Sequence, residues 1–282
     1  TVPERIIVGN GSTELISLFI QVEHPKKAMI LGPTYSEYER EVALGGGSTV
    51  YYPLKEELEY QLDIEHFTSK LQDDIDLLIL CNPNNPTSTS IDTEGMRRIL
   101  DVCMEHDETY VEFCDQVKKI SSIPLTAYYN NIIILRGTSK FFAAPGLRLG
   151  YAVTGNMDLL RSINQYKNPW MINSLAAIAG ELMFSDSAYI EETRNLIISE
   201  RQRMYDLFRA SDRFHPYRPT ANFMLCKILD EHTSGDLFDR AIRRKMMIRD
   251  CSTFPFLSEK YIRFCFMKKE DNDRLAECLL KD

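Results

Sequence analysis

The sequence lacks any hydrophobic run of the roughly 20 residues that a transmembrane helix requires, and residues 1–4 do not resemble a signal peptide. Basic side chains are in the minority: 33 lysines and arginines against 41 aspartates and glutamates give a net charge of −8. Binding to a phosphate backbone requires a basic face, and none is apparent here. We therefore expect a soluble cytoplasmic protein that binds neither nucleic acid nor membranes.

Metal and redox motifs are also lacking. The chain has seven cysteines without a CxxC pair, and five histidines without the spacing of metal ligands. Cys81 and Cys265 lie among apolar neighbours, where reduced cysteine acts as a small hydrophobe. We therefore expect no metal site. Internal repeats and low-complexity tracts are absent as well.

Short β-branched or aliphatic runs alternate with amphipathic stretches through the first two-thirds of the chain. Strands are predicted at residues 5–8, 28–31, 76–81, 132–136 and 148–153, and helices at residues 13–22, 36–44, 93–105 and 157–166. This alternation predicts an α/β fold with a mainly parallel central sheet flanked by helices. Ligands of such sheets bind at the carboxyl ends of the strands, so the loops that follow strands are the candidate site.

The pattern changes after residue 173. Long helical stretches at residues 173–184 and 188–210 precede predicted strands at 222–226, 246–249 and 261–266, with helices at 236–245 and 270–280. We expect a large domain over residues 1–185 and a smaller α+β domain over residues 186–282.

The first polar loop, residues 9–14 (Gly-Asn-Gly-Ser-Thr-Glu), lies between a predicted strand and a predicted helix. Glycines permit a tight turn, and the helix start offers free N–H groups to an anion. A dinucleotide fingerprint requires glycine where Glu14 stands, and a P-loop requires Gly-Lys-Ser/Thr, so neither motif is present. The loop alone favours a plain helix N-cap, with a phosphate cradle that includes Ser12 and Thr13 as the alternative.

The second loop carries Lys140, which is followed by an apolar segment that begins with two phenylalanines. A lysine among small and apolar residues loses solvation, which favours the neutral, nucleophilic amine. Arg148 and the hydroxyls of Thr138 and Ser139 are candidates to bind an anion beside it. A solvated lysine–arginine pair is the alternative, and the flanking rings weaken it.

The third loop, residues 82–87 (Asn-Pro-Asn-Asn-Pro-Thr), also ends a predicted strand. Its two Asn-Pro steps predict a rigid turn that points the amide side chains in fixed directions. A turn explains the prolines but leaves the three asparagines unexplained.

In combination, these loops resemble the class I and II aminotransferase family, the fold type I enzymes that depend on pyridoxal 5′-phosphate. The resemblance covers essentially the whole chain. It is closest to the histidinol-phosphate aminotransferases and the threonine-phosphate decarboxylases, and residues 168–177 are more similar to the decarboxylases.

The resemblance implies a role for each candidate residue. Lys140 would bind the cofactor and shuttle a proton. The phosphate group of the cofactor would be bound by Gly11, Ser12, Thr13, Thr138, Ser139 and Arg148. Tyr35 would stack on the pyridine ring, Asn85 and Tyr110 would bind the ring hydroxyl, and Asp107 would pair with the ring nitrogen. Arg263 would bind an anionic group of the substrate, and Asn173 and Trp170 would wall its pocket.

The implied activity is that of an enzyme that forms an external aldimine with an amino acid or a phosphorylated amine. Residues 168–177 favour L-threonine O-3-phosphate decarboxylation, and transamination of histidinol phosphate or of an aromatic amino acid is the alternative. A more remote alternative is a non-catalytic relative that binds the cofactor without turnover. The family also implies a homodimer whose active sites form at the subunit interface.

The chain departs from the family pattern in three places. The sequence begins at the strand before the first polar loop, so the family's N-terminal segment, which closes the active site, is either absent or not included in it. No strand residues separate the predicted helix ending near His106 from Asp107, so we hypothesise that residues are omitted there and that Asp107 could end this helix instead. Finally, Ser88 and Phe256 stand where glycines are expected, and a positive φ would strain Ser88.

Overall fold

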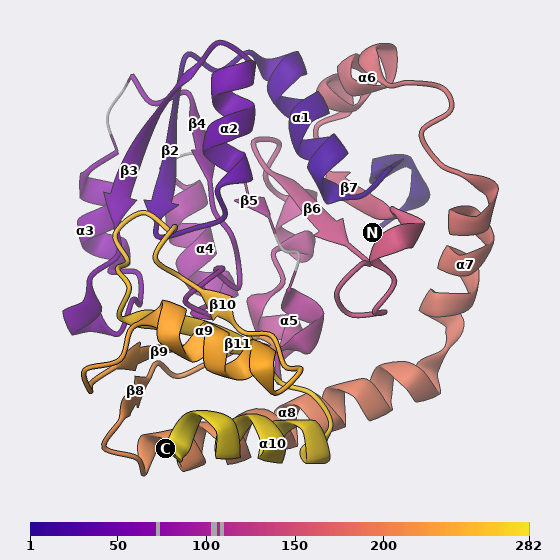
Figure 1. Cartoon of the computed structure of the whole chain (residues 1–282). Coiled ribbons are helices and arrows are strands. Elements are labelled where there is room, and N and C mark those ends of the chain that lie inside the picture. The colour runs from indigo at the N-terminus through magenta and orange to yellow at the C-terminus, as the bar shows by residue number, and fades with distance from the viewer. Residues whose placement is uncertain (72–73, 103–105, 108–109, 282) are drawn as a thin grey trace.

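The computed structural model describes residues 1–71, 74–102, 106–107 and 110–281, with only the backbone of His106 and Asp107 (Figure 1). None of the helices within these residues has the length and apolarity needed to cross a membrane.

A central sheet is built from two sets of strands. One has the order β1-β7-β6-β5 and the other the order β3-β2-β4, with β4 lying beside β5. The strands are β1 (Ile6–Gly9), β2 (Lys27–Gly32), β3 (Ser48–Pro53), β4 (Leu77–Ile79), β5 (His106–Asp107), β6 (Ile133–Gly137) and β7 (Gly150–Thr154). The β2–β3, β2–β4 and β5–β6 pairs are parallel, whereas β7 runs antiparallel to both of its neighbours. This confirms the mainly parallel sheet.

Successive residues of β6 pack on opposite faces of the sheet, as the strand period of two requires. Ile133 and Leu135 pack with one face's helices, α1 (Ser12–Glu23), α2 (Glu37–Leu44) and α6 (Met157–Tyr166). Ile134 packs on the other face, with α3 (Ile64–Ser69) and α4 (Thr93–Leu100). Helices therefore cover both faces of the sheet, as the alternating pattern predicts.

A second, antiparallel sheet follows in the order β10-β11-β9-β8. Its strands are β8 (Phe214–Pro216), β9 (Phe223–Ile228), β10 (Arg249–Asp250) and β11 (Tyr261–Cys265), and its helices are α8 (Ser187–Arg209), α9 (Ser234–Arg243) and α10 (Lys269–Leu280). In Figure 1 these elements form the lower layer, and α7 (Ser174–Ser185) runs down the side of the molecule toward α8. We propose that the domain boundary lies near Ser185, where α7 ends.

Three features differ from the sequence-based expectations. The elements β3, α3, β8 and the four-residue helix α5 (Val117–Ile120) were not predicted, because they are short or lack a clear alternation. The helix predicted to reach residue 105 ends at Leu100. Asp107 lies in the two-residue strand β5, parallel to β6, and does not end a helix. The omission of residues before it stays a hypothesis.

Glu56 ties the second sheet to the first. Its carboxylate accepts hydrogen bonds from Lys227 Nζ at 2.6 Å, and from the hydroxyls of Tyr217 and Tyr261, each at 2.9 Å. Burial alone would raise the pKa of Glu56, but these hydrogen bonds outweigh burial and lower that pKa. The carboxylate is therefore charged near neutral pH and holds three groups of the second sheet.

Candidate active site

A cavity of about 250 Å³ lies at the carboxyl ends of the central strands, and we call it the lysine cavity. It gathers residues from the loops and helix starts that follow β1, β2, β4, β5 and β6, with one residue from β11. Of the predicted site residues it is lined by Gly11, Ser12, Thr13, Tyr35, Asn85, Tyr110, Ser139, Lys140, Arg148 and Arg263. Three lining residues were not predicted: Ile16 and Tyr38, each one helical turn beyond a predicted residue, and Cys81, which directly precedes the asparagine loop.

A candidate anion cradle forms one end of the lysine cavity. Gly11 precedes α1 with φ +88°, and no side chain caps the helix, so its first N–H groups face the cavity end unblocked. The guanidinium of Arg148 lies so close to Gly11 that a Cβ at this position would collide with it. Only glycine leaves room for this arrangement, in which a helix N-terminus and a guanidinium favour the same negative charge.

Lys140 is exposed in the cavity rather than desolvated. The prediction that apolar neighbours would desolvate its amine is therefore wrong. The reason is that Phe141 turns into the core, where it is 3% exposed, and Phe142 stacks on Tyr189 with ring centroids 5.8 Å apart. The flanking rings stabilise the loop that carries the lysine and do not cover the lysine itself.

The opposite end of the cavity is formed by Arg263, which β11 contributes. Its guanidinium lies 5.0 Å from the ring centroid of Phe223, and its Nη1 donates a hydrogen bond to Oδ1 of Asn85. Its Nε is buried without a hydrogen-bond partner among the described residues. A buried, unpaired N–H of a guanidinium is costly unless an acceptor binds there, which makes Arg263 a candidate anion-binding residue.

Two asparagines of the asparagine loop stabilise the fold, and the third lines the lysine cavity. Asn82 bonds both the N–H and the C=O of Ile91, each at 2.8 Å. Asn84 donates to the carbonyl of Pro33 at 2.9 Å and accepts from the hydroxyl of Thr34 at 2.8 Å. Asn85 is therefore the asparagine that faces the lysine cavity, and the other two fix the loop that presents it.

Three predicted site residues that the structure describes, Thr138, Asn173 and Trp170, do not line the cavity. Thr138 is buried, and its hydroxyl donates to the carbonyl of Leu149 at 2.9 Å. Asn173 caps α7 by accepting from the N–H of Ala176 at 2.8 Å, and Trp170 is 88% exposed. The side chain of Asp107 lies outside the described residues, so its pairing with a ring nitrogen stays a prediction.

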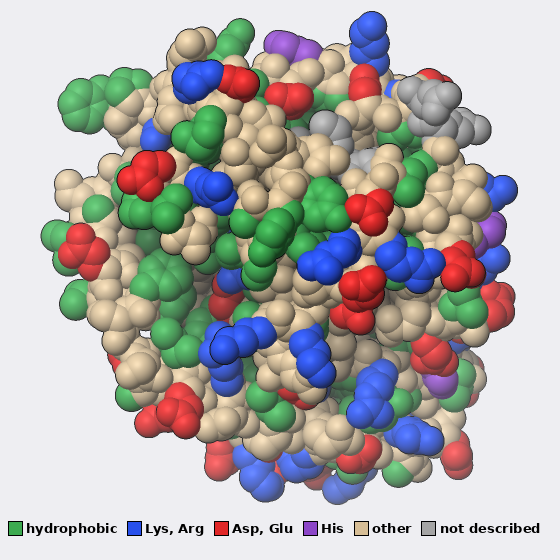
Figure 2. Space-filling model, turned by 180° about the vertical axis from the view of Figure 1, so that it is seen from behind, with side chains coloured by type: hydrophobic (Ala, Val, Ile, Leu, Met, Phe, Trp, Pro, Cys, Tyr) green, Lys and Arg blue, Asp and Glu red, His purple; other side chains and the backbone are tan. Residues whose placement is uncertain are grey.

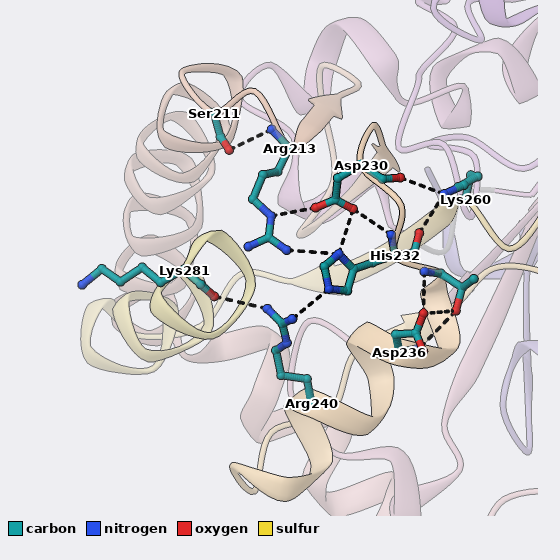
Figure 3. A network of polar contacts seen from close by, with 9 residues as sticks. Ser211, Arg213, Asp230, His232, Asp236, Arg240, Lys260 and Lys281 are labelled. Atoms are coloured by element: carbon teal, nitrogen blue, oxygen red, sulfur yellow. Dashed lines mark hydrogen bonds and ion pairs between the residues drawn. The ribbon is translucent and has the colours of Figure 1, made fainter.

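One group of side chains has the proximity of metal ligands. Asp230, Glu231 and His232 each offer an atom within 4.8 Å of the others. Figure 3 shows why Asp230 and His232 are already engaged: Arg213 Nε donates to Asp230 Oδ2 at 2.8 Å, and Arg240 Nη2 lies 3.1 Å from His232 Nε2. These contacts join Arg240 of α9, through His232 and Asp230, to Arg213 in the segment that follows α8.

Comparison with known proteins gives an independent assignment. A family model described as "Aminotransferase class I and II" matches residues 1–279. A putative threonine-phosphate decarboxylase of Caldanaerobacter subterraneus subsp. tengcongensis is 36% identical, over 98% of this chain and 76% of its own. The threonine-phosphate decarboxylase of Salmonella typhimurium is 32% identical, over 97% of this chain and 76% of its own. The crystal structure of the histidinol-phosphate aminotransferase from Clostridium acetobutylicum superposes with a TM-score of 0.91 at 32% identity, covering 98% of this chain and 82% of that one.

Ser88 yields a testable prediction about the asparagine loop. Its φ is +61°, which lies in the left-handed region that strains a serine, as expected where a glycine would stand. Its Oγ accepts hydrogen bonds from the backbone N–H groups of Thr220 at 3.2 Å and Ala221 at 2.9 Å. Ser88→Ala keeps the strain and loses these bonds, which should reduce the free energy of unfolding by about 1–3 kcal/mol. Ser88→Gly also loses these hydrogen bonds, but it relieves the backbone strain, which restores about 1 kcal/mol of stability.

Urea unfolding of the two variants tests this order, with Ser36→Ala, at an exposed serine that makes no capping bond, as the matched control. We expect Ser88→Gly to be intermediate between the wild type and Ser88→Ala. An alanine variant as stable as the wild type would show that the hydroxyl does not offset the strain.

Proposed function

The chain belongs to the class I and II aminotransferase family, and from this premise we propose that it is an enzyme that binds pyridoxal 5′-phosphate in the lysine cavity. The observation that carries the proposal is the convergence in one cavity of an amine, Lys140, with an anion-binding group at each end, Arg148 and Arg263. A reactive amine between two anion sites fits a phosphorylated aldehyde cofactor and an anionic substrate that bind side by side.

The residues present fit the cofactor phosphate. Gly11 leaves the space between α1 and Arg148 open, and the free N–H groups of Ser12 and Thr13 begin the helix. Ser139 adds a hydroxyl to the cavity wall. We assign these groups and Arg148 to the phosphate, because a helix N-terminus with a guanidinium binds a dianion strongly. Thr138 is assigned a supporting role, since its hydroxyl is bound to Leu149.

The ring of the cofactor is assigned to the middle of the cavity. Tyr35 lies there with its ring perpendicular to that of Tyr38, centroids 5.6 Å apart, which fixes its orientation for stacking. The Oδ1 of Asn85 is occupied by Arg263, which leaves its N–H₂ group to donate to a ring oxygen. Tyr110 lines the same wall, held edge-on against Phe223. Asp107 is the proposed partner of the ring nitrogen.

When bound, pyridoxal phosphate supplies a ring that accepts the electron pair of the substrate bond that breaks. Lys140 attaches the cofactor and afterwards takes up and returns a proton at its Nζ, which is accessible in the cavity. Arg263 binds the carboxylate or phosphate of the substrate through its unpaired Nε and its remaining N–H groups. Asn85 holds the guanidinium in this position, so that one end of the substrate is fixed while the other faces Lys140.

We propose L-threonine O-3-phosphate as the substrate and decarboxylation as the reaction. Two relatives with at least 32% identity carry the name threonine-phosphate decarboxylase, and the substrate's two anionic groups suit a cavity rich in cations. Transamination of histidinol phosphate is the second candidate, favoured by the similarity to the Clostridium acetobutylicum structure. The two differ in the substrate bond that is held perpendicular to the ring.

The activity test separates the two reactions. With pyridoxal phosphate and L-threonine O-3-phosphate, we expect release of CO₂ and formation of the phosphorylated amino alcohol. With histidinol phosphate and 2-oxoglutarate, we expect little glutamate. Lys140→Ala should lower the rate by at least about 100-fold because the proton-transferring amine is lost, whereas Lys70→Ala, at an exposed lysine remote in sequence, should not.

Formation of glutamate without release of CO₂ would show that the reaction is transamination and not decarboxylation. An unchanged rate in Lys140→Ala would contradict the assignment of the lysine cavity as the active site.

We further propose that the protein is a homodimer that associates through α7. Leu175, Ile178 and Leu182 are 72%, 60% and 66% exposed and share one face of this helix, since they are three and four residues apart. Figure 2 shows hydrophobic side chains gathered at the left of the molecule, where α7 lies in this view. Three large apolar side chains exposed on one helix face support the interface that the family implies.

If the protein is a dimer through α7, charges placed on this face should halve its mass in solution. Ile178→Asp with Leu182→Asp places two charges in the interface, and the variant should sediment as a monomer at micromolar concentration. Leu44→Asp, at a leucine of α2 that is 68% exposed, is the matched control and should leave the dimer intact. A wild-type protein that sediments as a monomer would contradict the proposal.

A further inference from the structure

A second cavity, of about 450 Å³, lies outside the lysine cavity and shares none of its lining residues. It opens between the asparagine-loop end, α5, α8 and the segment between β8 and β9, and we call it the Arg201 cavity. Its lining includes residues of both proposed domains, and its volume is in the range of small-molecule sites, about 300–1,000 Å³.

The inner wall of the Arg201 cavity is a buried guanidinium. Arg201, from α8, is 6% exposed, and its Nη1 donates to the carbonyls of Phe113 at 3.1 Å and Thr220 at 2.6 Å. Its Nη2 pairs with Asp115. Burial is the main cause that lowers the pKa of Arg201; Cys114 opposes it, and the like charge of Arg218 lowers the pKa further. Positive charge is thus concentrated here, and a bound anion would relieve the repulsion between the two arginines.

The acids of this cavity are already engaged. Asp115 pairs with Arg201, and Asp92 caps α4 by accepting from the N–H of Gly95 at 2.7 Å. Lys119 and Arg218 remain, and across the part of the chain that the structure describes neither forms a hydrogen bond or an ion pair through its side chain. The guanidinium of Arg218 lies over the ring of Tyr205, 5.7 Å from its centroid, which holds it at the cavity wall.

Lys119 and Arg218 come from opposite sides of the cavity. Lys119 belongs to α5, and its backbone carbonyl accepts a hydrogen bond from the hydroxyl of Thr93 at the start of α4. Arg218 belongs to the segment that leads into β9, two residues before the Thr220 that bonds Ser88. A ligand bound by both cations would therefore join the two proposed domains beside the loop that presents Asn85.

We propose that the Arg201 cavity binds a small organic anion, whose phosphate or carboxylate groups are bound by Lys119 and Arg218. With three cations set against two acids, the cavity retains one positive charge, which suits an anion that carries one or two negative charges. The hydroxyls of Ser90 and Thr220 and the amide of Gln116 offer hydrogen bonds to the uncharged part of the ligand.

Titration calorimetry of the protein saturated with pyridoxal phosphate tests the proposal, because the cofactor then fills the cradle of the lysine cavity. The probes are inorganic phosphate and, separately, succinate, at constant ionic strength, with glycerol as the uncharged control. We expect one site per chain for at least one of the two anions. Lys119→Met with Arg218→Met should weaken its affinity by about tenfold or more, since charge-assisted hydrogen bonds are lost.

Matched variants separate the two cavities. Lys118→Met removes the neighbouring exposed lysine of α5, which does not line the cavity, and should bind as the wild type does. Arg218→Lys retains the charge and should keep most of the affinity. Arg263→Met alters the lysine cavity alone and should also bind normally. The titration measures no turnover, so its outcome is independent of the proposed reaction.

Three results would overturn the proposal: no binding of either anion to the wild type, unchanged affinity in the double variant, or loss of binding in Arg263→Met. The last result would place the anion in the lysine cavity. Circular dichroism of the double variant confirms that it is folded, which is expected because both side chains are exposed and make no ion pair.

Discussion

The hydrogen bond from Arg263 to Asn85 joins side chains that are 178 residues apart, and the lysine cavity depends on it. Arg263 belongs to the second sheet, whereas the other lining residues come from loops and helices that follow strands of the central sheet. The cavity therefore has its second anion-binding end only when the two sheets are held together. Glu56, which accepts hydrogen bonds from Lys227, Tyr217 and Tyr261, holds them together at another point.

The asparagine loop is the element that both cavities share. Asn82 and Asn84 fix its path, Asn85 contacts Arg263, and Ser88 bonds the backbone of the segment that leads into β9. The loop then continues to Asp92, at the wall of the Arg201 cavity. The loop therefore positions Arg263 through Asn85, and it connects the Arg201 cavity directly to the lysine cavity.

Much of the fold and the turn at Gly11 could be predicted, because these features depend on residues close in sequence. Burial on both faces follows from the apolar run at the start of β6, and the tight turn before α1 follows from Gly11. Features that depend on distant residues could not be predicted. The exposure of Lys140 results from the packing of Phe141 against the second sheet, and the φ of Ser88 is offset by hydrogen bonds to residues more than 130 positions away.

The central claim is that Lys140 holds pyridoxal phosphate between Arg148 and Arg263. The most direct test is to incubate the protein with pyridoxal phosphate, reduce it with borohydride and map the modified peptide by mass spectrometry. We expect a single modified lysine, Lys140, at one cofactor per chain, and no modification at stoichiometric cofactor in Lys140→Ala. Stable modification of another lysine in place of Lys140, or none in the wild-type protein, would contradict the account.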